Sequence, residues 1–189
     1  MMTMNEGQDT VTLSPLFGEG GVLQSGAPLR IWGVGRPCSQ VRITIADRSA
    51  TATVGDDGAW RVQLDPLEPG GPYRLEVRVD GGDEPVIAHD VYAGEVFVCA
   101  GQSNMEYQME FLRWRYPSEY AREPDPLLRH CKVPVRFDFH GPRRDFDEPV
   151  RWVGAAADTL DEFTGVGYFF GRMVRAWLGV PVGLLNITL

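Results

Sequence analysis

The sequence predicts a β-sandwich followed by an incomplete α/β domain with a parallel sheet. Three observations lead to this fold class: apolar residues alternate with period two in the first half of the chain, a continuous apolar run occupies residues 96–100, and a helix with clear start and stop signals precedes a last apolar strand. With 189 residues, of which 43% are hydrophobic, the chain can bury a core in one or two small domains.

The first predicted domain is a sandwich of jelly-roll or immunoglobulin-like type at residues 13–92, which follows a predicted disordered tail at residues 1–12. Alternating apolar positions indicate half-buried strands around Leu29–Ile31, Val41–Ile45, Trp60–Leu64 and Tyr73–Val79. Turns that contain glycine and proline separate these strands at the intervals expected of a small antiparallel sandwich.

The second predicted domain spans residues 93–189 and begins with the buried strand at residues 96–100. A helix is expected between Thr164 as its N-cap and Gly179 as its stop signal. Its predicted apolar face holds Val166, Phe169, Phe170, Met173, Val174 and Trp177.

A long insertion separates the first buried strand of this domain from the last one, which is predicted at residues 182–187. Residues 117–126 are charged and rich in proline, so they are expected to form a loop. Residues 133–139 alternate again and predict an edge or bulged strand, because Pro134 has no N–H to donate.

The charge balance argues against a nucleic-acid partner. Eighteen Lys and Arg against 26 Asp and Glu give a net charge of −8, which repels phosphate backbones and anionic lipids. The N-terminus lacks the basic and apolar regions of a secretory signal, and no apolar run approaches the ~20 residues of a membrane span. We therefore expect a cytoplasmic location and no membrane partner.

Cysteine and histidine are too scattered to predict a metal site or a disulfide framework. Cys38, Cys99 and Cys131 are odd in number, and neither they nor the three histidines have the spacing of metal ligands. We expect free thiols, no metal and no organic cofactor.

The candidate site is the tetrapeptide Gly101-Gln102-Ser103-Asn104, which lies between the carboxyl end of the strand at residues 96–100 and a helix predicted through Met105, Met109 and Leu112. Ligands and catalytic groups collect outside the carboxyl ends of the strands in open α/β sheets. A serine on such a turn exposes its hydroxyl, and the N–H groups and dipole of the next helix stabilise an oxyanion. Ser103 is therefore a candidate nucleophile for acyl transfer, and it requires a histidine base.

The competing interpretation is purely structural. Ser103 or Asn104 would cap the helix that begins at Met105, and Gln102 and Asn104 would be turn-forming residues. Local sequence alone favours this more frequent use of such residues.

Residues 94–105, GEVFVCAGQSNM, resemble the nucleophile block of the sialate O-acetylesterase family, which are carbohydrate esterases of the SGNH hydrolase superfamily. Phe97 stands where the family usually has tryptophan, and Ala100 where it usually has serine. Further segments are similar in the same order: Gly21–Gln24, Ile31–Gly33, Asp57–Trp60, Gly70–Tyr73, Phe163–Gly171 and Val180–Asn186.

The resemblance implies a sandwich before a flavodoxin-like esterase domain, with Ser103 attacking an acetyl ester on a sugar hydroxyl. In the family, the amide of the serine that matches Ser103 contributes to the oxyanion hole, and the substrates are acetylated sialic acids, xylan or related glycans. We predict that Gly101, Gln102 and Asn104 beside Ser103 take part in oxyanion and substrate binding. The family's later blocks, which bring the oxyanion glycine and asparagine and the triad Asp and His, have no counterpart in the 189 residues. His130 and His140 fall in the insertion, and His140 is the weak alternative as a base.

The resemblance therefore implies an esterase lineage without establishing activity of this chain alone. Two other functions remain open: a non-catalytic module that binds glycan or protein, and a subunit that completes its sheet with another chain. Flavodoxin-like strand order would leave the far edge of the strand at residues 182–187 unpaired, and such an edge favours homo-oligomerisation or pairing with a complementary chain.

Overall fold

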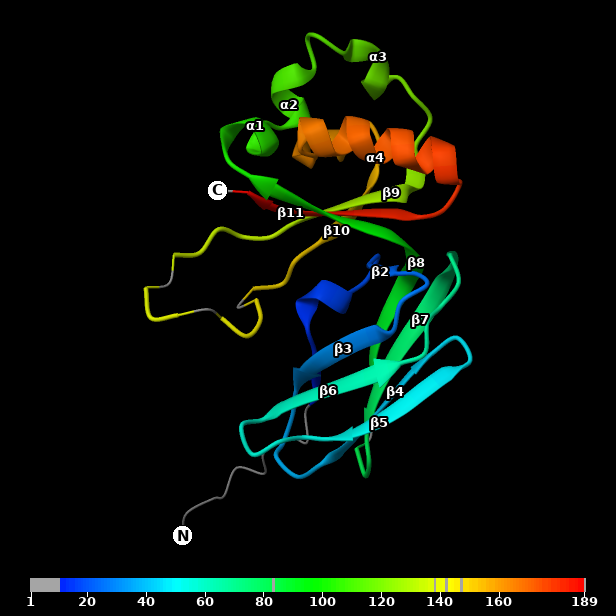
Figure 1. The fold of residues 1–189 in the computed structure, drawn as a ribbon, viewed down its shortest axis with the longest axis vertical. Coiled ribbons are helices and arrows are strands. Elements are labelled where there is room, and N and C mark those ends of the chain that lie inside the picture. The colour runs from blue at the N-terminus through cyan, green and yellow to red at the C-terminus, as the bar shows by residue number, and fades with distance from the viewer. Residues whose placement is uncertain (1–10, 83, 138, 142, 147, 189) are drawn as a thin grey trace.

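One long strand, β8 (Val86–Gly101), runs through both halves of the molecule. The computed structural model describes residues 11–82, 84–137, 139–141, 143–146 and 148–188. Figure 1 shows a group of strands at the bottom and a layer of strands covered by a helix at the top, with β8 crossing from one to the other. Residues 1–10, most of the predicted disordered tail, lie outside the described residues.

The N-terminal half is built from two sheets that enclose a common core. Its elements are β1 (Thr12–Leu13), the 3-10 helix η1 (Pro15–Phe17), β2 (Val22–Gln24), β3 (Leu29–Val34), β4 (Gln40–Ile45), β5 (Arg48–Thr53), β6 (Ala59–Leu64) and β7 (Gly70–Val79). One sheet has the order β1-β3-β6, and β5, β4, β7 and β8 form one end of the other. Structure begins slightly before residue 13, because Val11 is buried and Thr12 pairs with Val34.

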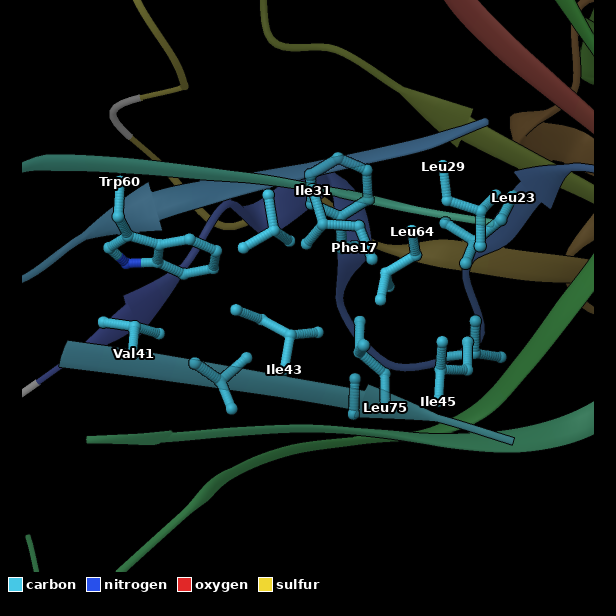
Figure 2. Close-up of a cluster of buried hydrophobic side chains, with 14 of the residues drawn as sticks. Phe17, Leu23, Leu29, Ile31, Val41, Ile43, Ile45, Trp60, Leu64 and Leu75 are labelled. Atoms are coloured by element: carbon cyan, nitrogen blue, oxygen red, sulfur yellow. The ribbon is translucent and has the colours of Figure 1, made fainter. Parts of the chain in front are cut away.

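Alternating burial along these strands follows the period predicted from the sequence. In β3, Leu29 and Ile31 are buried while Arg30 is exposed, and β4 and β6 repeat the pattern. Figure 2 shows how the buried side chains of β3 and β6 face those of β4 and β7. This core excludes water from both sheets and gives β8 a rigid base.

The C-terminal half is a sheet with the strand order β10-β9-β11-β8. Its further elements are α1 (Ser103–Glu106), α2 (Met109–Leu112), α3 (Pro117–Tyr120), β9 (Asp125–Lys132), β10 (Trp152–Ala155), the 3-10 helix η2 (Leu160–Glu162), α4 (Gly165–Leu178) and β11 (Val182–Thr188). β11 is parallel to both β8 and β9, and β10 is antiparallel to β9. No helix in the described part is long and apolar enough to cross a membrane.

The strand β9 corrects three expectations. The predicted loop at residues 117–126 contains α3 and the start of β9, and the strand expected at residues 133–139 lies at Asp125–Lys132 instead. β9 pairs with the edge of β11 that was expected to be bare. The alternation at residues 133–139 was misleading, because Val135, Phe137 and Phe139 are exposed.

Helix α4 has the predicted ends but buries a different face. Thr164 caps it by accepting from the Gly167 N–H at 3.4 Å, and Gly179 ends it with φ of 71°. The predicted apolar face is largely in solvent, with Met173 70% and Trp177 84% exposed. The buried face contains Gly167 and Gly171, where an added Cβ would lie 2.9 Å from Cys99 Sγ and 2.8 Å from Leu128 Cδ1. These glycines let the helix backbone lie close to the sheet, a contact that a hydrophobicity pattern does not reveal.

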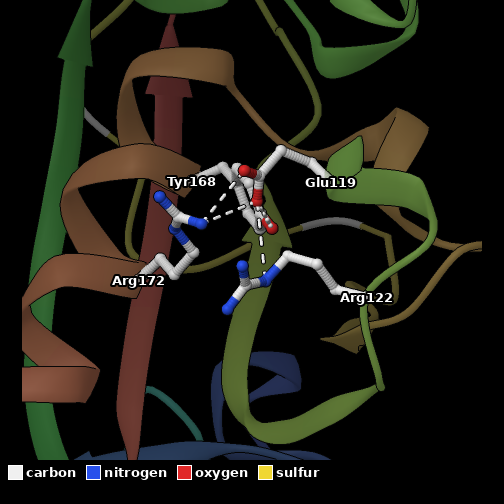
Figure 3. A network of polar contacts seen from close by, with 4 residues as sticks. All are labelled: Glu119, Arg122, Tyr168 and Arg172. Atoms are coloured by element: carbon white, nitrogen blue, oxygen red, sulfur yellow. Dashed lines mark hydrogen bonds and ion pairs between the residues drawn. The ribbon is translucent and has the colours of Figure 1, made fainter. Parts of the chain in front are cut away.

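A network of polar contacts holds α3 against α4 (Figure 3). The Glu119 carboxylate accepts hydrogen bonds from the Tyr168 hydroxyl at 2.9 Å and from Arg172 Nη1 at 2.9 and 3.0 Å. Arg122 Nε lies 3.6 Å from the same carboxylate. Burial, together with the Glu119 charge, raises the pKa of Tyr168 to about 12, so Tyr168 remains a hydrogen-bond donor at physiological pH.

The guanidinium of Arg129 joins the two halves. This buried side chain on β9 donates to the Gly20 carbonyl at 3.0 Å and to Asp90 Oδ2 at 2.6 Å. Asp90 adopts a φ of 58° where the pairing of β7 with β8 is irregular. Trp152 adds a second link by donating its Nε1–H to the Leu16 carbonyl at 3.0 Å.

Gly94 is the point on β8 where the two halves meet, and a larger residue there should strongly destabilise the fold. A Cβ at this position would lie 2.0 Å from the Pro181 carbonyl oxygen, which cannot move without disturbing β11. We expect Gly94→Ala to lower the free energy of unfolding by about 3 kcal/mol, as overpacking of a rigid core does.

Urea denaturation followed by circular dichroism measures this loss. Gly35→Ala is the matched control, since its Cβ would meet nothing closer than Val54 Cγ2 at 3.4 Å. Equal midpoints for the two variants would contradict the close approach at Gly94.

Candidate active site

The nucleophile turn begins where β8 leaves the sheet at Gly101. This residue has φ of 158°, and an added Cβ would lie 3.0 Å from Met105 Cβ. A glycine is therefore required for the chain to turn from the strand directly into α1. Gly101, Gln102, Ser103 and Asn104 together line an open depression, and all four are exposed.

The interpretation of Ser103 or Asn104 as a helix cap is wrong. The N-cap of α1 is Gln102, whose side chain makes no capping hydrogen bond, and Ser103 is the first residue of the helix. The cap position thus lies one residue before Ser103, and the helix starts two residues before the expected Met105. Within the described part of the chain, no hydrogen bond occupies the Ser103 hydroxyl.

Helix α1 has only four residues, so the expected stabilisation by the dipole of a following helix is small. The remaining source of stabilisation for an oxyanion is the backbone N–H groups of the turn. The N–H groups of Ser103 and Asn104 are the first two of the helix and have no acceptor within it. They are the donors that this turn offers to a developing oxyanion.

The single helix expected through Met105, Met109 and Leu112 is divided into α1 and α2. Residues 107 and 108 lie between them and bond to the start of α4: Gly165 donates its N–H to the Tyr107 carbonyl at 2.8 Å, and Gln108 forms a bridge with Thr164. The Thr164 hydroxyl also lies 3.7 Å from Met105 Sδ. The turn that holds Ser103 is thereby anchored to the buried end of α4.

Asn186 is a buried polar residue near this turn that the sequence interpretation did not select. Its Oδ1 accepts from the Thr188 hydroxyl at 2.9 Å and from the Thr188 N–H at 3.2 Å, and Thr188 lies opposite Gly101 in the sheet. Its Nδ2 is buried without a partner among the described residues. The signal that could have found it is a lone amide within the apolar strand at residues 182–187.

None of the three histidines forms a hydrogen bond with the Ser103 side chain in the part of the chain that the structure describes. His130, expected in a loop-like insertion, lies in β9, is 1% exposed and stacks on Phe163 with ring centroids 4.8 Å apart. Burial, aided by the charge of Lys132, lowers the pKa of His130 to about 4, so the ring is neutral at pH 7. His89 is exposed in the N-terminal part of β8, and His140 is exposed in the segment after β9.

The cysteines do not form a cluster either. Cys38 is exposed, Cys99 and Cys131 are buried, and all three are free thiols. Burial raises the pKa of Cys131 to about 12, which makes it an unreactive core residue at neutral pH. In the described part of the chain, no group of three or more His, Cys, Asp or Glu side chains could hold a metal ion.

Comparison with known proteins places the chain as a whole among its relatives. No protein-family model matches the chain. The sialate O-acetylesterase of Mus musculus is 34% identical over 174 residues, which are 82% of this chain and 31% of the mouse protein. A crystal structure of a carbohydrate acetylesterase from Xanthomonas citri superposes with a TM-score of 0.87 at 34% identity and covers 95% of this chain.

The chain is a relative of the sialate O-acetylesterases. The resemblance inferred from residues 94–105 is therefore confirmed. The Homo sapiens sialate O-acetylesterase is 33% identical over 84 residues, which are 40% of this chain. This chain spans only 31% of the length of the mouse protein and 40% of the Xanthomonas citri chain.

Because His130 is buried in a neutral form, the stability of the folded chain should depend on pH. The pKa of His130 is about 4 in the folded chain and 6.5 in the unfolded chain, so below pH 6.5 the unfolded state binds a proton that the folded state does not. Stability should fall as the pH drops from 6.5 to 4, by about 3 kcal/mol in total.

Urea unfolding of the wild-type chain and of His130→Phe at several pH values measures the contribution of His130 to this pH dependence. Phenylalanine keeps a ring against Phe163 but cannot bind a proton, so the variant should lose stability less steeply between pH 6.5 and 5. Parallel pH profiles for the two proteins would contradict a neutral, buried His130.

Proposed function

We propose that Ser103 is the nucleophile of a serine esterase that removes acetyl groups from sugar hydroxyls. The observation that supports this most directly is the exposed Ser103 hydroxyl, free of any capping hydrogen bond, on a glycine turn at the carboxyl end of β8. The relatives named above include an acetylesterase for sialate and one for carbohydrate, and both align with most of this chain.

We further propose that residues 13–92 are a β-sandwich and that residues 93–189 are the first part of an SGNH-type α/β domain. The separate core of the N-terminal half and the parallel strands β8, β9 and β11 support this division. β8 crosses the proposed boundary without a break, so the two domains share a strand rather than a linker.

In the proposed reaction, Ser103 Oγ attacks the acetyl carbonyl carbon and its proton passes to a base. The carbonyl oxygen becomes an oxyanion that accepts from the N–H groups of Ser103 and Asn104, with Gly101 and Gln102 shaping the turn. The sugar hydroxyl leaves with a proton, and water then hydrolyses the acetyl-enzyme. The base must lie within hydrogen-bond reach of Oγ in the substrate complex.

A second candidate is a chain that acts together with another chain or a second copy. Three observations favour it. The Ser103 hydroxyl has no base among its described contacts, and apolar side chains of α4 are exposed at Val166, Phe170, Met173 and Trp177. On the side away from β11, residues 97–101 of β8 pair with no described strand. A complementary strand at this edge would support the function of a partner subunit or binding module.

Substitution of Ser103 separates the two functions. Ser103→Ala should reduce acetate release from p-nitrophenyl acetate to background, because no other group replaces the attacking oxygen. It should change the free energy of unfolding by less than about 0.5 kcal/mol, since the hydroxyl caps no helix.

The measurement compares wild type, Ser103→Ala and Ser118→Ala, a control serine exposed on α3. A phosphonate probe with mass spectrometry should label Ser103 and leave Ser118 unlabelled. Unchanged hydrolysis in Ser103→Ala would remove this residue from the mechanism, and a folded wild type without hydrolysis or labelling would favour the second candidate.

A further inference from the structure

A pocket of about 450 Å³ lies between the N-terminal half and the segment that follows β9. Its size is within the range of small-molecule sites. Trp32 of β3 forms one wall, and Pro134, Phe146 and the side chains of Arg136 and Glu148 contribute to the others. Neither the proposed chemistry of Ser103 nor the core of either half makes use of this space.

The tryptophan wall of the pocket is held in a fixed orientation. Asp145 Oδ2 accepts from Trp32 Nε1 at 3.2 Å, and its Oδ1 accepts from the buried Ser14 hydroxyl at 2.7 Å. Phe17 packs edge-on against Trp32 with ring centroids 4.5 Å apart. A ring fixed in this way loses little conformational freedom when a ligand stacks on it.

The lining of the pocket carries both signs of charge, with Arg136, Arg143 and Arg144 beside Asp145 and Glu148. Arg136 forms an ion pair with Glu148, and Arg144 forms one with Asp57 of the N-terminal half. A paired guanidinium still has N–H groups to donate, and a paired carboxylate still has lone pairs to accept. The pocket therefore offers hydrogen bonds in both directions without demanding a charged ligand.

These features together match an uncharged sugar ring. A pyranose has an apolar face of C–H groups that packs on an aromatic ring, and hydroxyls around its edge that both donate and accept. Trp32 and Phe146 supply the aromatic surface, and the paired arginines and carboxylates supply the polar rim.

The pocket and Ser103 lie at the same end of the sheet, where the parallel strands have their carboxyl ends. β8, β9 and β11 are parallel, so their carboxyl ends point the same way, as Figure 1 shows for β8 and for the segment after β9. Val133, which lines the pocket, donates its N–H to the Asn186 carbonyl at 2.9 Å, and Asn186 pairs with Cys99 of β8. Two strand spacings, about 10 Å, thus separate the start of the pocket wall from the strand that ends at the nucleophile turn.

We propose that this pocket is a sugar-binding subsite, so that the chain acts on an oligosaccharide whose acetylated residue reaches Ser103 while another, uncharged residue of the same oligosaccharide stacks on Trp32. This inference rests on the proposed esterase function for the role of the acetyl group. The subsite itself, however, binds sugar whether or not Ser103 is reactive.

Binding of unacetylated oligosaccharides tests the subsite independently of hydrolysis. The full 189-residue chain is titrated with xylotetraose, cellotetraose and mannotetraose, and with sialyllactose as a charged alternative. The indole N–H signals of the five tryptophans are followed by NMR, and the Trp32→Phe spectrum assigns the Trp32 signal. We expect at least one uncharged tetrasaccharide to shift the Trp32 signal.

Two variants and one control complete the experiment. Phe146→Ala and Trp32→Phe should each weaken binding about tenfold, the effect of losing an aromatic anchor. Trp114→Ala, which removes a 79% exposed tryptophan outside the pocket, should leave binding unchanged. Thermal unfolding confirms that each variant is folded.

The proposal is overturned if no uncharged tetrasaccharide binds the folded wild type, if only sialyllactose binds, or if both pocket variants bind as tightly as Trp114→Ala. Because these sugars carry no ester, loss of the proposed function would leave the binding result intact. Esterase activity without tetrasaccharide binding would remove the subsite alone.

Discussion

The pairing of β8 with strands of both halves is the constraint on which the rest of the structure depends. Its first part pairs with β7 in the N-terminal half, and its last seven residues pair with β11. Gly94 allows the backbone to pass against Pro181 at the junction, and Arg129 secures the same region from β9. Ser103 therefore follows a strand held in two cores, which places its hydroxyl by rigid structure rather than by a loop.

Much of the fold could be predicted because the responsible forces act locally. Period-two alternation identified the strands β3, β4, β6 and β7, and the Thr164 cap and Gly179 stop defined α4. β9 was missed because Arg129 and His130 are buried in it, and a charged residue in a buried strand is recognised only through partners distant in sequence, such as Gly20 and Asp90. The buried face of α4 was missed because glycines, which carry no hydrophobic signal, form it.

The candidate site could likewise be predicted only in part from the sequence. Gly101 and Ser103 could be placed at a strand end because strand, turn and helix follow one another directly in the chain. Their energetic roles could not be predicted, because the cap position depends on where α1 begins. The length of α1 in turn depends on how residues 107–108 bond to the start of α4. His130 shows the same limit: only the fold reveals that burial keeps it neutral and away from Ser103.

Exposed apolar side chains of the C-terminal half lie along the unpaired edge of β8, the strand that leads to Ser103, and on the helix α4 beside it. On the face of β8 that α4 covers, the ring of Phe97 meets Phe170 of α4 edge-on at 4.8 Å. Val98, 58% exposed, lies on the opposite face of the same unpaired part of β8. The exposed residues of α4 continue the apolar surface that begins at Phe97 and Phe170, at helical spacing. A parallel strand added at this edge would bring its own carboxyl end beside the nucleophile turn, where a base has to lie. Covering the apolar surface and completing the chemistry of Ser103 are therefore linked requirements of the same part of the fold.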